Sequence, residues 1–92
     1  NFKLKITDLY TKNKEFNKAL VILDSLKKTY IYDRKIKNAE AVILFYQAKN
    51  QEENGLIDEA LVNYEAAYEL NSEDKGSLMR MINLHINEKT FK

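Results

Sequence analysis

His85 and four acidic residues are the side chains whose types could support chemistry in this chain. His85 is the only histidine and there is no cysteine, so the converging ligands of a transition-metal site are missing. Glu52-Glu53 and Asp58-Glu59 could form an acid–base pair or hold calcium, but EF-hand spacing is absent. Acids beside helix N-termini are favoured electrostatically, so we interpret the four as residues of helix ends and solvent, and His85 as a surface or half-buried helical residue.

The sequence also lacks the short motifs typical of enzymes and of cofactor-binding proteins. It contains no Gly-rich phosphate loop, no nucleophile motif and no dinucleotide fingerprint. The six tyrosines could stack on nucleic-acid bases beside lysines, but Tyr10, Tyr64 and Tyr68 fall at helical spacing and are core candidates first. We therefore expect no enzymatic activity, no cofactor and no metal site.

Composition indicates one small helical domain. The chain has 92 residues, of which 45% are hydrophobic and 32% charged, as in folded chains that are neither disordered nor membrane-spanning. No apolar run approaches the roughly 18 residues that a membrane span requires. With no proline and two glycines, turn residues are scarce, which favours helices over many short strands. Because the sequence begins Asn-Phe-Lys rather than with Met, we expect it to be part of a longer protein, whose compartment stays open.

Charge is distributed unevenly along the sequence. Residues 1–37 carry a net charge of +6 and residues 38–92 a net charge of −5, although the whole chain is only +1. The basic half could steer an acidic partner, including nucleic acid, or let copies of the chain stack head to tail. Solvated lysines on helix surfaces are the simpler interpretation, and nucleic-acid binding through the basic half is the weaker alternative.

Apolar residues recur at spacings of three and four in the segments 2–11, 16–30, 34–54, 57–70 and 75–87, which predicts five helices. Asn13-Lys14 and Asn54-Gly55 punctuate the pattern; Asn13 tolerates a left-handed conformation, and Gly55 suits the position after a helix. Ser72 and Asp74 suit the start of the last helix. The residues expected to face the core are Phe2, Ile6, Leu9, Tyr10, Phe16, Ala19, Leu20, Leu23, Leu26, Tyr30, Ala39, Val42, Ile43, Tyr46, Ala48, Ile57, Ala60, Leu61, Tyr64, Ala67 and Tyr68.

An internal repeat links two of these helices. Ala19-Leu20-Val21 recurs as Ala60-Leu61-Val62, 41 residues later. Repetition of helix–turn–helix units is the signature of an α-solenoid, in which each unit buries one face against its neighbours. Flanking positions match at the same interval, namely Asn13 with Asn54, Phe16 with Ile57, Asn17 with Asp58, Leu23 with Tyr64, and Asp24 with Glu65.

The order of large and small residues between positions 41 and 72 resembles a tetratricopeptide repeat, a unit of about 34 residues made of helices A and B. Leu44 and Ala48 fit helix A, Gly55 fits the interhelical turn, and Ala60, Tyr64 and Ala67 fit helix B. Three positions depart from the family pattern. Gln47 occupies a position that is usually aliphatic, Gln51 one that is usually tyrosine, and Ser72 one that is usually proline.

The resemblance divides the chain 1–92 into one domain of three parts. Residues 1–33 form a degenerate unit, in which Lys14 stands where glycine is usual, and residues 34–72 form the unit with the best match. Residues 73–92 resemble helix A of a truncated or capping unit, with Leu78 and Ile82 in its large and small positions. The implied fold is all-α: antiparallel helix–turn–helix repeats in a short right-handed solenoid of two units plus one extra helix.

In this family helix A lines a concave groove that binds a peptide or helix of another protein, so the resemblance implies a protein–protein interaction scaffold. Some members of the family bind a C-terminal carboxylate with a clamp of basic and amide side chains. Here Leu4 and Phe45 occupy positions where that clamp would need lysine, and only Arg80 and Asn83 match parts of it. The expected ligand is therefore a mixed apolar and charged peptide. Besides Leu4, the groove positions are Asp8, Lys12, Val42, Phe45, Lys49, Glu52, Met79, Asn83 and Ile86.

The last predicted helix is apolar on more than one side, which leaves a second function open. A terminal helix of a repeat array needs a polar outer face. Another repeat could therefore follow in a longer chain, or a second copy could pair with this helix, in which case the chain would serve self-association within a larger regulatory protein. The apolar residues are Leu78, Met79, Met81, Ile82, Leu84, Ile86 and Phe91.

Overall fold

The computed structural model contains five helices and, within the residues it describes, no strand. It describes residues 2–31, 33–73 and 75–90, and the side chains of this part as far as Ile86. The helices are α1 (Phe2–Lys12), α2 (Phe16–Thr29), α3 (Arg34–Glu53), α4 (Ile57–Leu70) and α5 (Lys75–Thr90). The predicted all-α class is confirmed, and the predicted boundaries agree to within one residue except at the C-terminal end of α5, which is three residues longer.

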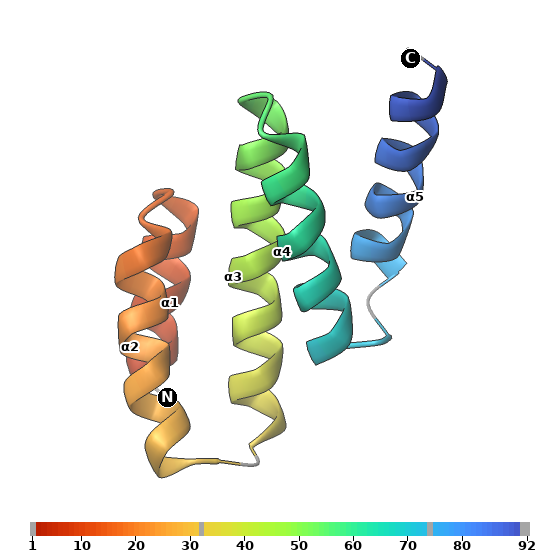
Figure 1. Ribbon diagram of the computed structural model, residues 1–92. Coiled ribbons are helices and arrows are strands. Elements are labelled where there is room, and N and C mark those ends of the chain that lie inside the picture. Colours follow the sequence, from red (N-terminus) through yellow and green to blue (C-terminus); the bar gives the residue numbers. More distant parts are fainter. Residues whose placement is uncertain (1, 32, 74, 91–92) are drawn as a thin grey trace.

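The helices follow one another in space in the order of the chain, each antiparallel to the one before (Figure 1). Helix α1 forms a hairpin with α2, α3 forms a hairpin with α4, and α5 packs on α4. Contacts between α2 and α3 and between α1 and α3 join the two hairpins. The result is elongated, 46 × 25 × 16 Å, with the layered arrangement of a helical repeat.

The two hairpin turns have the same backbone hydrogen bonds at an interval of 41 residues. The amides of Asn13, Lys14 and Glu15 donate to Leu9, Thr11 and Tyr10 in the first turn. Those of Asn54, Gly55 and Leu56 donate to Asn50, Glu52 and Gln51 in the second turn. These bonds satisfy the last carbonyls of α1 and α3. The internal repeat found in the sequence is thus also a repeat of backbone geometry.

Lys14, and not Asn13, is the left-handed residue of the first turn. Its φ is 63°, and no other described non-glycine residue has a positive φ. Gly55, at the equivalent place in the second turn, has a φ of 82°. The preference of asparagine for this conformation is outweighed by its position, because Asn13 still continues the hydrogen bonding of the helix by donating to Leu9.

The core consists of two clusters that meet at α3. The predicted core residues of α2 and α4 are largely confirmed: Ala19, Leu23, Ala60, Tyr64 and Ala67 are fully buried. The first cluster comprises Ala19, Leu23, Leu26, Ile36 and Ile43. The second comprises Ala48, Ala60, Tyr64 and Leu84. Small side chains at Ala48, Ala60 and Ala67 allow α3 and α4 to approach closely.

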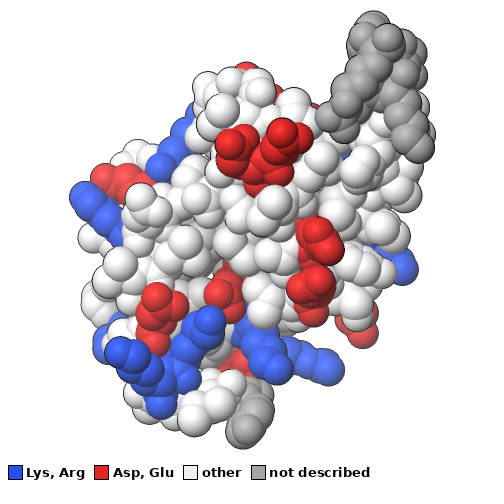
Figure 2. All heavy atoms as spheres, in the orientation of Figure 1, with Lys and Arg blue, Asp and Glu red and all other residues white. Residues whose placement is uncertain are grey.

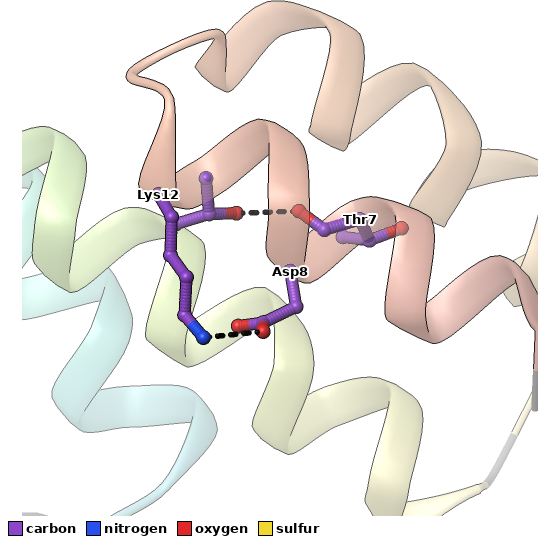
Figure 3. Close-up of polar contacts among 4 residues, drawn as sticks. Thr7, Asp8 and Lys12 are labelled. Carbon is purple, nitrogen blue, oxygen red and sulfur yellow. Dashed lines mark hydrogen bonds and ion pairs between the residues drawn. The ribbon is translucent and has the colours of Figure 1, made fainter.

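Helix α1 is rotated from the orientation that its apolar residues predict. Phe2 and Leu9 are 76% and 65% exposed, whereas Thr7 and Thr11 are buried. The Thr7 and Thr11 hydroxyls donate to the carbonyls of Lys3 and Thr7 over 2.8 Å, the second of which is drawn in Figure 3. Because these hydroxyls are satisfied within their own helix, the two small side chains can be buried against neighbouring helices.

Three other apolar residues expected in the core are exposed. Tyr30 (48%), Val42 (44%) and Tyr46 (48%) lie at the surface, and Ile36 and Ala41 are buried in α3 instead. Among the side chains of α5 that the structure describes, Ser77 and Leu84 are buried, while Ile82 is 44% exposed and so does not take the inward small position. Asn71 organises the connection before α5, since its side chain accepts a hydrogen bond from the amide of Glu73. Asp74 and Phe91 lie outside the described residues.

Candidate functional site

Residues of α1, α3 and α5 line hollows at the surface of the molecule, and two of these hollows contain predicted groove residues. Asp8, Lys12, Val42 and Lys49 line the first hollow. Phe45, Glu52, Met79, Asn83 and Ile86 line the second. The structure therefore brings the nine predicted groove residues together in two groups. Leu4, the other groove position, packs instead against the first core cluster.

The first hollow combines cations with an apolar floor. Its volume is about 420 Å³, and Phe16, Val42 and Tyr46 contribute its apolar surface. Lys12 forms an ion pair with Asp8 on the same helix, with 3.1 Å between Nζ and Oδ2 (Figure 3). This pair is largely exposed to solvent and so contributes little to stability. Lys14 and Lys49 lie at the same hollow with Glu53 as the remaining acid, so the hollow has a slight excess of positive charge.

The second hollow is built around Glu52. Its volume is about 540 Å³. The hydroxyl of Tyr64, from α4, donates to Oε1 of Glu52 over 2.8 Å. Nη1 of Arg80, from α5, lies 3.6 Å from Oε2 of the same carboxylate. One carboxylate of α3 therefore links three helices at the base of this hollow.

Tyr64 is held in its neutral form by this environment. The side chain is fully buried, and this burial raises the pKa of the Tyr64 hydroxyl well above its ordinary value. The hydrogen bond to Glu52 raises the pKa further, because ionisation would place a second negative charge beside the carboxylate. The hydroxyl therefore acts as a permanent hydrogen-bond donor to Glu52 over the physiological pH range.

Phe45 joins the two hollows. Its ring contacts the rings of Tyr46 and Tyr64 edge to face, with centroid distances of 5.5 and 5.6 Å. Such contacts fix the ring orientation. A third depression, of about 470 Å³, is lined by Val42 and Phe45 as well as by Ala41, Tyr46, Asn71 and Glu73. Since Val42 also lines the first hollow and Phe45 the second, the face is continuous from α1 to α5.

Lys14, Phe16 and Tyr46 line the first hollow but were not predicted for the groove. Tyr46 was assigned to the core because of its helical spacing. However, it lies four residues after Val42 on the same helix face, so the groove assignment of Val42 already contained the signal. Arg80 was predicted only as a partial match to a carboxylate clamp, and its contact with Glu52 depends on how α5 packs, which the sequence does not reveal.

The described part of the chain offers little for metal chemistry. It contains no group of three or more His, Cys, Asp or Glu side chains that could hold a metal ion, and His85 is exposed. Among the described residues, no helix is both long enough and apolar enough to span a bilayer.

Comparison with known proteins gives no match of any kind: no protein-family model, no curated protein and no solved structure matches this chain.

Proposed function

We propose that this chain is a non-catalytic scaffold that binds a peptide or helix of another protein on the face of α1, α3 and α5. In this proposal the two hairpins and α5 form a short right-handed solenoid of the tetratricopeptide kind, with α1, α3 and α5 as the A helices. The support is the repeated turn geometry at an interval of 41 residues together with the grouping of the nine groove residues around two hollows.

Exposed apolar side chains on this face carry the proposal. Val42 and Tyr46 at the first hollow are 44% and 48% exposed, and Met79 and Ile86 at the second are 56% and 55% exposed. Charged residues such as Lys49 and Glu53 surround them. Apolar anchors with a polar rim are typical of protein-binding surfaces. The two hollows suit a ligand segment that carries apolar side chains and at least one carboxylate.

The polar groups of the second hollow favour binding over catalysis. Both oxygens of the Glu52 carboxylate have partners, Tyr64 and Arg80, so the carboxylate is a poor candidate for a general base. Nη1 of Arg80 faces that carboxylate, so only the other guanidinium nitrogens of Arg80 can donate to a ligand. We therefore assign these groups to the shape and charge of a binding surface.

A peptide-display selection tests the proposal. Peptides selected from a random library against the wild-type chain are measured by fluorescence anisotropy against Tyr46→Glu/Met79→Glu, which places one charge in each hollow. We expect at least tenfold weaker binding, because each change introduces an unpaired charge at an apolar contact. The matched control is Val21→Glu/Val62→Glu. Val21 and Val62 are equivalent positions on α2 and α4, with exposures of 69% and 65%.

Equal binding by the wild-type chain and the hollow variant would contradict the proposal, as would equal losses in the hollow variant and in the control. Both variants change only exposed side chains, so both are expected to fold. Circular dichroism before the binding measurement checks this for each variant.

A second candidate function is self-association through α5. Met79, Ile82 and Ile86 lie at spacings of three and four on this helix, and each is at least 44% exposed. Met79 and Ile86 belong to the second hollow, whereas Ile82 does not line it. Ile82→Lys therefore separates the two functions. If light scattering shows a concentration-dependent mass that Ile82→Lys abolishes while peptide binding stays unchanged, self-association is a distinct activity.

A further inference from the structure

A cluster of five cations lies at the end of the molecule where α2 connects to α3. Lys27 and Lys28 are in the last turn of α2, and Arg34, Lys35 and Lys37 are in the first turn of α3. All five are exposed. Figure 2 shows Lys and Arg gathered at the lower end of the molecule, where Figure 1 places this connection. We name these five residues the basic end.

Most of this charge is not neutralised locally. Glu40 pairs with Lys27, with 3.1 Å between Oε2 and Nζ. The Asp33 carboxylate accepts the backbone amide of Lys35 over 2.7 Å, where it caps α3. Within the described part of the chain, no carboxylate forms an ion pair with the other four cations, which are Lys28, Arg34, Lys35 and Lys37.

Helix stability does not account for three of the five cations. Lys27 and Lys28 lie at the negative end of the α2 dipole, which favours them. Arg34, Lys35 and Lys37 lie at the positive end of the α3 dipole, where the first turn contains no acid. By contrast, the first turn of α4 contains Asp58 and Glu59. The start of α3 therefore keeps positive charge at an electrostatic cost to folding.

Two exposed apolar residues lie between these cations in the sequence. Tyr30, which follows α2, is 48% exposed, and Ile31 is 65% exposed. Ile31 has the larger exposed fraction, and its side chain has no group that could hydrogen-bond with an aqueous or nucleic-acid partner. Exposed apolar residues flanked in the sequence by cations combine two features of proteins that bind at a membrane interface.

We propose that the basic end docks on the surface of a bilayer that contains anionic phospholipid. Lys28, Arg34, Lys35 and Lys37 contact the negative headgroups, while Ile31 and Tyr30 enter the interface between headgroups and acyl chains. The exposed Ile31 side chain favours a lipid surface over nucleic acid, because an aliphatic side chain gains from leaving water at a bilayer but has no ring to stack on bases.

Docking at this end leaves the peptide-binding face accessible. Lys35 and Lys49 are both in α3, and the helical rise places them roughly 20 Å apart along its axis. The first hollow, which Lys49 lines, therefore lies toward the opposite end of this helix. The proposal does not depend on the proposed function, because neither hollow includes a residue of the basic end.

Vesicle co-sedimentation tests the proposal. The probes are vesicles of phosphatidylcholine alone and vesicles with about one-third phosphatidylserine, whose surface attracts each nearby cation about fivefold. We expect binding to the anionic vesicles only, and its loss at high salt. Lys35→Glu, which removes two units of positive charge, is expected to weaken binding roughly twentyfold. Ile31→Ser is expected to weaken it several-fold, because less apolar surface leaves water.

Each variant has a matched control. Lys14→Glu changes net charge by the same amount as Lys35→Glu, but it lies in the turn between α1 and α2, at the opposite end of the hairpin (Figure 1). Val62→Ser removes an apolar side chain that is 65% exposed, as Ile31 is, from the surface of α4. Both controls are expected to bind anionic vesicles within about twofold of the wild-type chain, since screening confines the attraction to about 10 Å.

Three outcomes would overturn the proposal. The first is no binding to anionic vesicles at low salt. The second is a loss in the controls equal to the loss in the paired variants, which would indicate an effect of net charge alone. The third is binding to poly(U) RNA that exceeds vesicle binding and that Ile31→Ser leaves unchanged, which would make the basic end a nucleic-acid surface.

Discussion

Lys14 and Gly55 have the same left-handed backbone conformation at the same place in two successive turns. Their φ angles are 63° and 82°, and each amide donates to the carbonyl three residues earlier, Thr11 and Glu52 respectively. Glycine adopts this conformation freely, whereas a residue with a β-carbon loses about 1 kcal/mol or more. The first turn is therefore a strained version of the second.

Lys14→Gly is expected to raise the free energy of unfolding by about 1 kcal/mol, because it removes this strain at the position after a helix. Urea denaturation followed by circular dichroism measures the change. Gly55→Ala is the reciprocal test and is expected to lower the free energy of unfolding by about 1 kcal/mol. A new β-carbon at Gly55 would have no atom within 4 Å, so the loss would reflect backbone strain alone. A stabilising Gly55→Ala would contradict the shared geometry.

The orientation of α1 gives a second prediction. Thr7→Asp is expected to lower the free energy of unfolding by about 3 kcal/mol, because it introduces a charge where the side chain is 2% exposed. Leu9→Asp, at a residue that is 65% exposed, is expected to change it by about 0.5 kcal/mol or less. Thermal and urea unfolding of the two variants measure these changes. If α1 instead packed through the apolar residues that its sequence suggests, the order of the two effects would be reversed.

The hydrogen bond between Tyr64 and Glu52 gives a third prediction. Tyr64→Phe keeps the buried ring and removes the hydroxyl, and is expected to lower the free energy of unfolding by about 1–2 kcal/mol. Tyr46→Phe is the matched control, because Tyr46 is 48% exposed and its hydroxyl can bind water in either state. A loss of the same size in both variants would show that the contact with Glu52 contributes nothing specific.

The raised pKa of Tyr64 gives a fourth prediction, for alkaline solution. Below pH about 10, the pKa of an unfolded tyrosine, both states keep the proton and the stabilisation is fully present. As pH rises above this value the unfolded chain loses the proton while the folded chain keeps it, so stability falls by up to about 1.4 kcal/mol per pH unit. Tyr64→Phe lacks this contribution. The difference between the two unfolding free energies should shrink between pH 9 and pH 11, and a constant difference would contradict the raised pKa.

The start of α3 gives a fifth prediction, which separates binding from folding. Lys35→Glu is expected to raise the free energy of unfolding by about 0.5 kcal/mol, because a negative charge is favoured in the first turn of a helix. Urea denaturation at low salt measures the change, which should diminish as salt is added. A variant that is more stable and yet binds anionic vesicles less well excludes unfolding as the cause of the lost binding.

The sequence predicted the helices well because the interruptions between them are chemically distinct. Asn54-Gly55 ends α3 as expected, and the second turn has the left-handed glycine that its residue types require. The repeat of Ala19 and Ala60 was equally informative, since both alanines are fully buried. Such local signals need no knowledge of the neighbouring helices.

The orientation of the outer helices could not be predicted in the same way, because it depends on what each helix packs against. Thr7 and Thr11 are buried since their hydroxyls bind the backbone of α1 itself, and residue type alone ranks them below Phe2 and Leu9. Tyr46 has the spacing of a core residue, but α3 packs into the two core clusters through Ile36 and Ile43 and through Ala48. The groove positions come from the family resemblance and not from this packing, and the structure groups nine of them around two hollows.

Helix α3 contributes to both core clusters, through Ile36 and Ile43 to the first and through Ala48 to the second. Apart from α3, the two clusters are formed by different helices. The packing of one cluster can therefore be disrupted while residues of the other cluster stay in contact. Native-state hydrogen exchange should therefore be slowest at the amides in the middle of α3 and faster toward both ends of the chain. The molecule is then expected to open from its ends inward, and α3 is the element that every partly unfolded form retains.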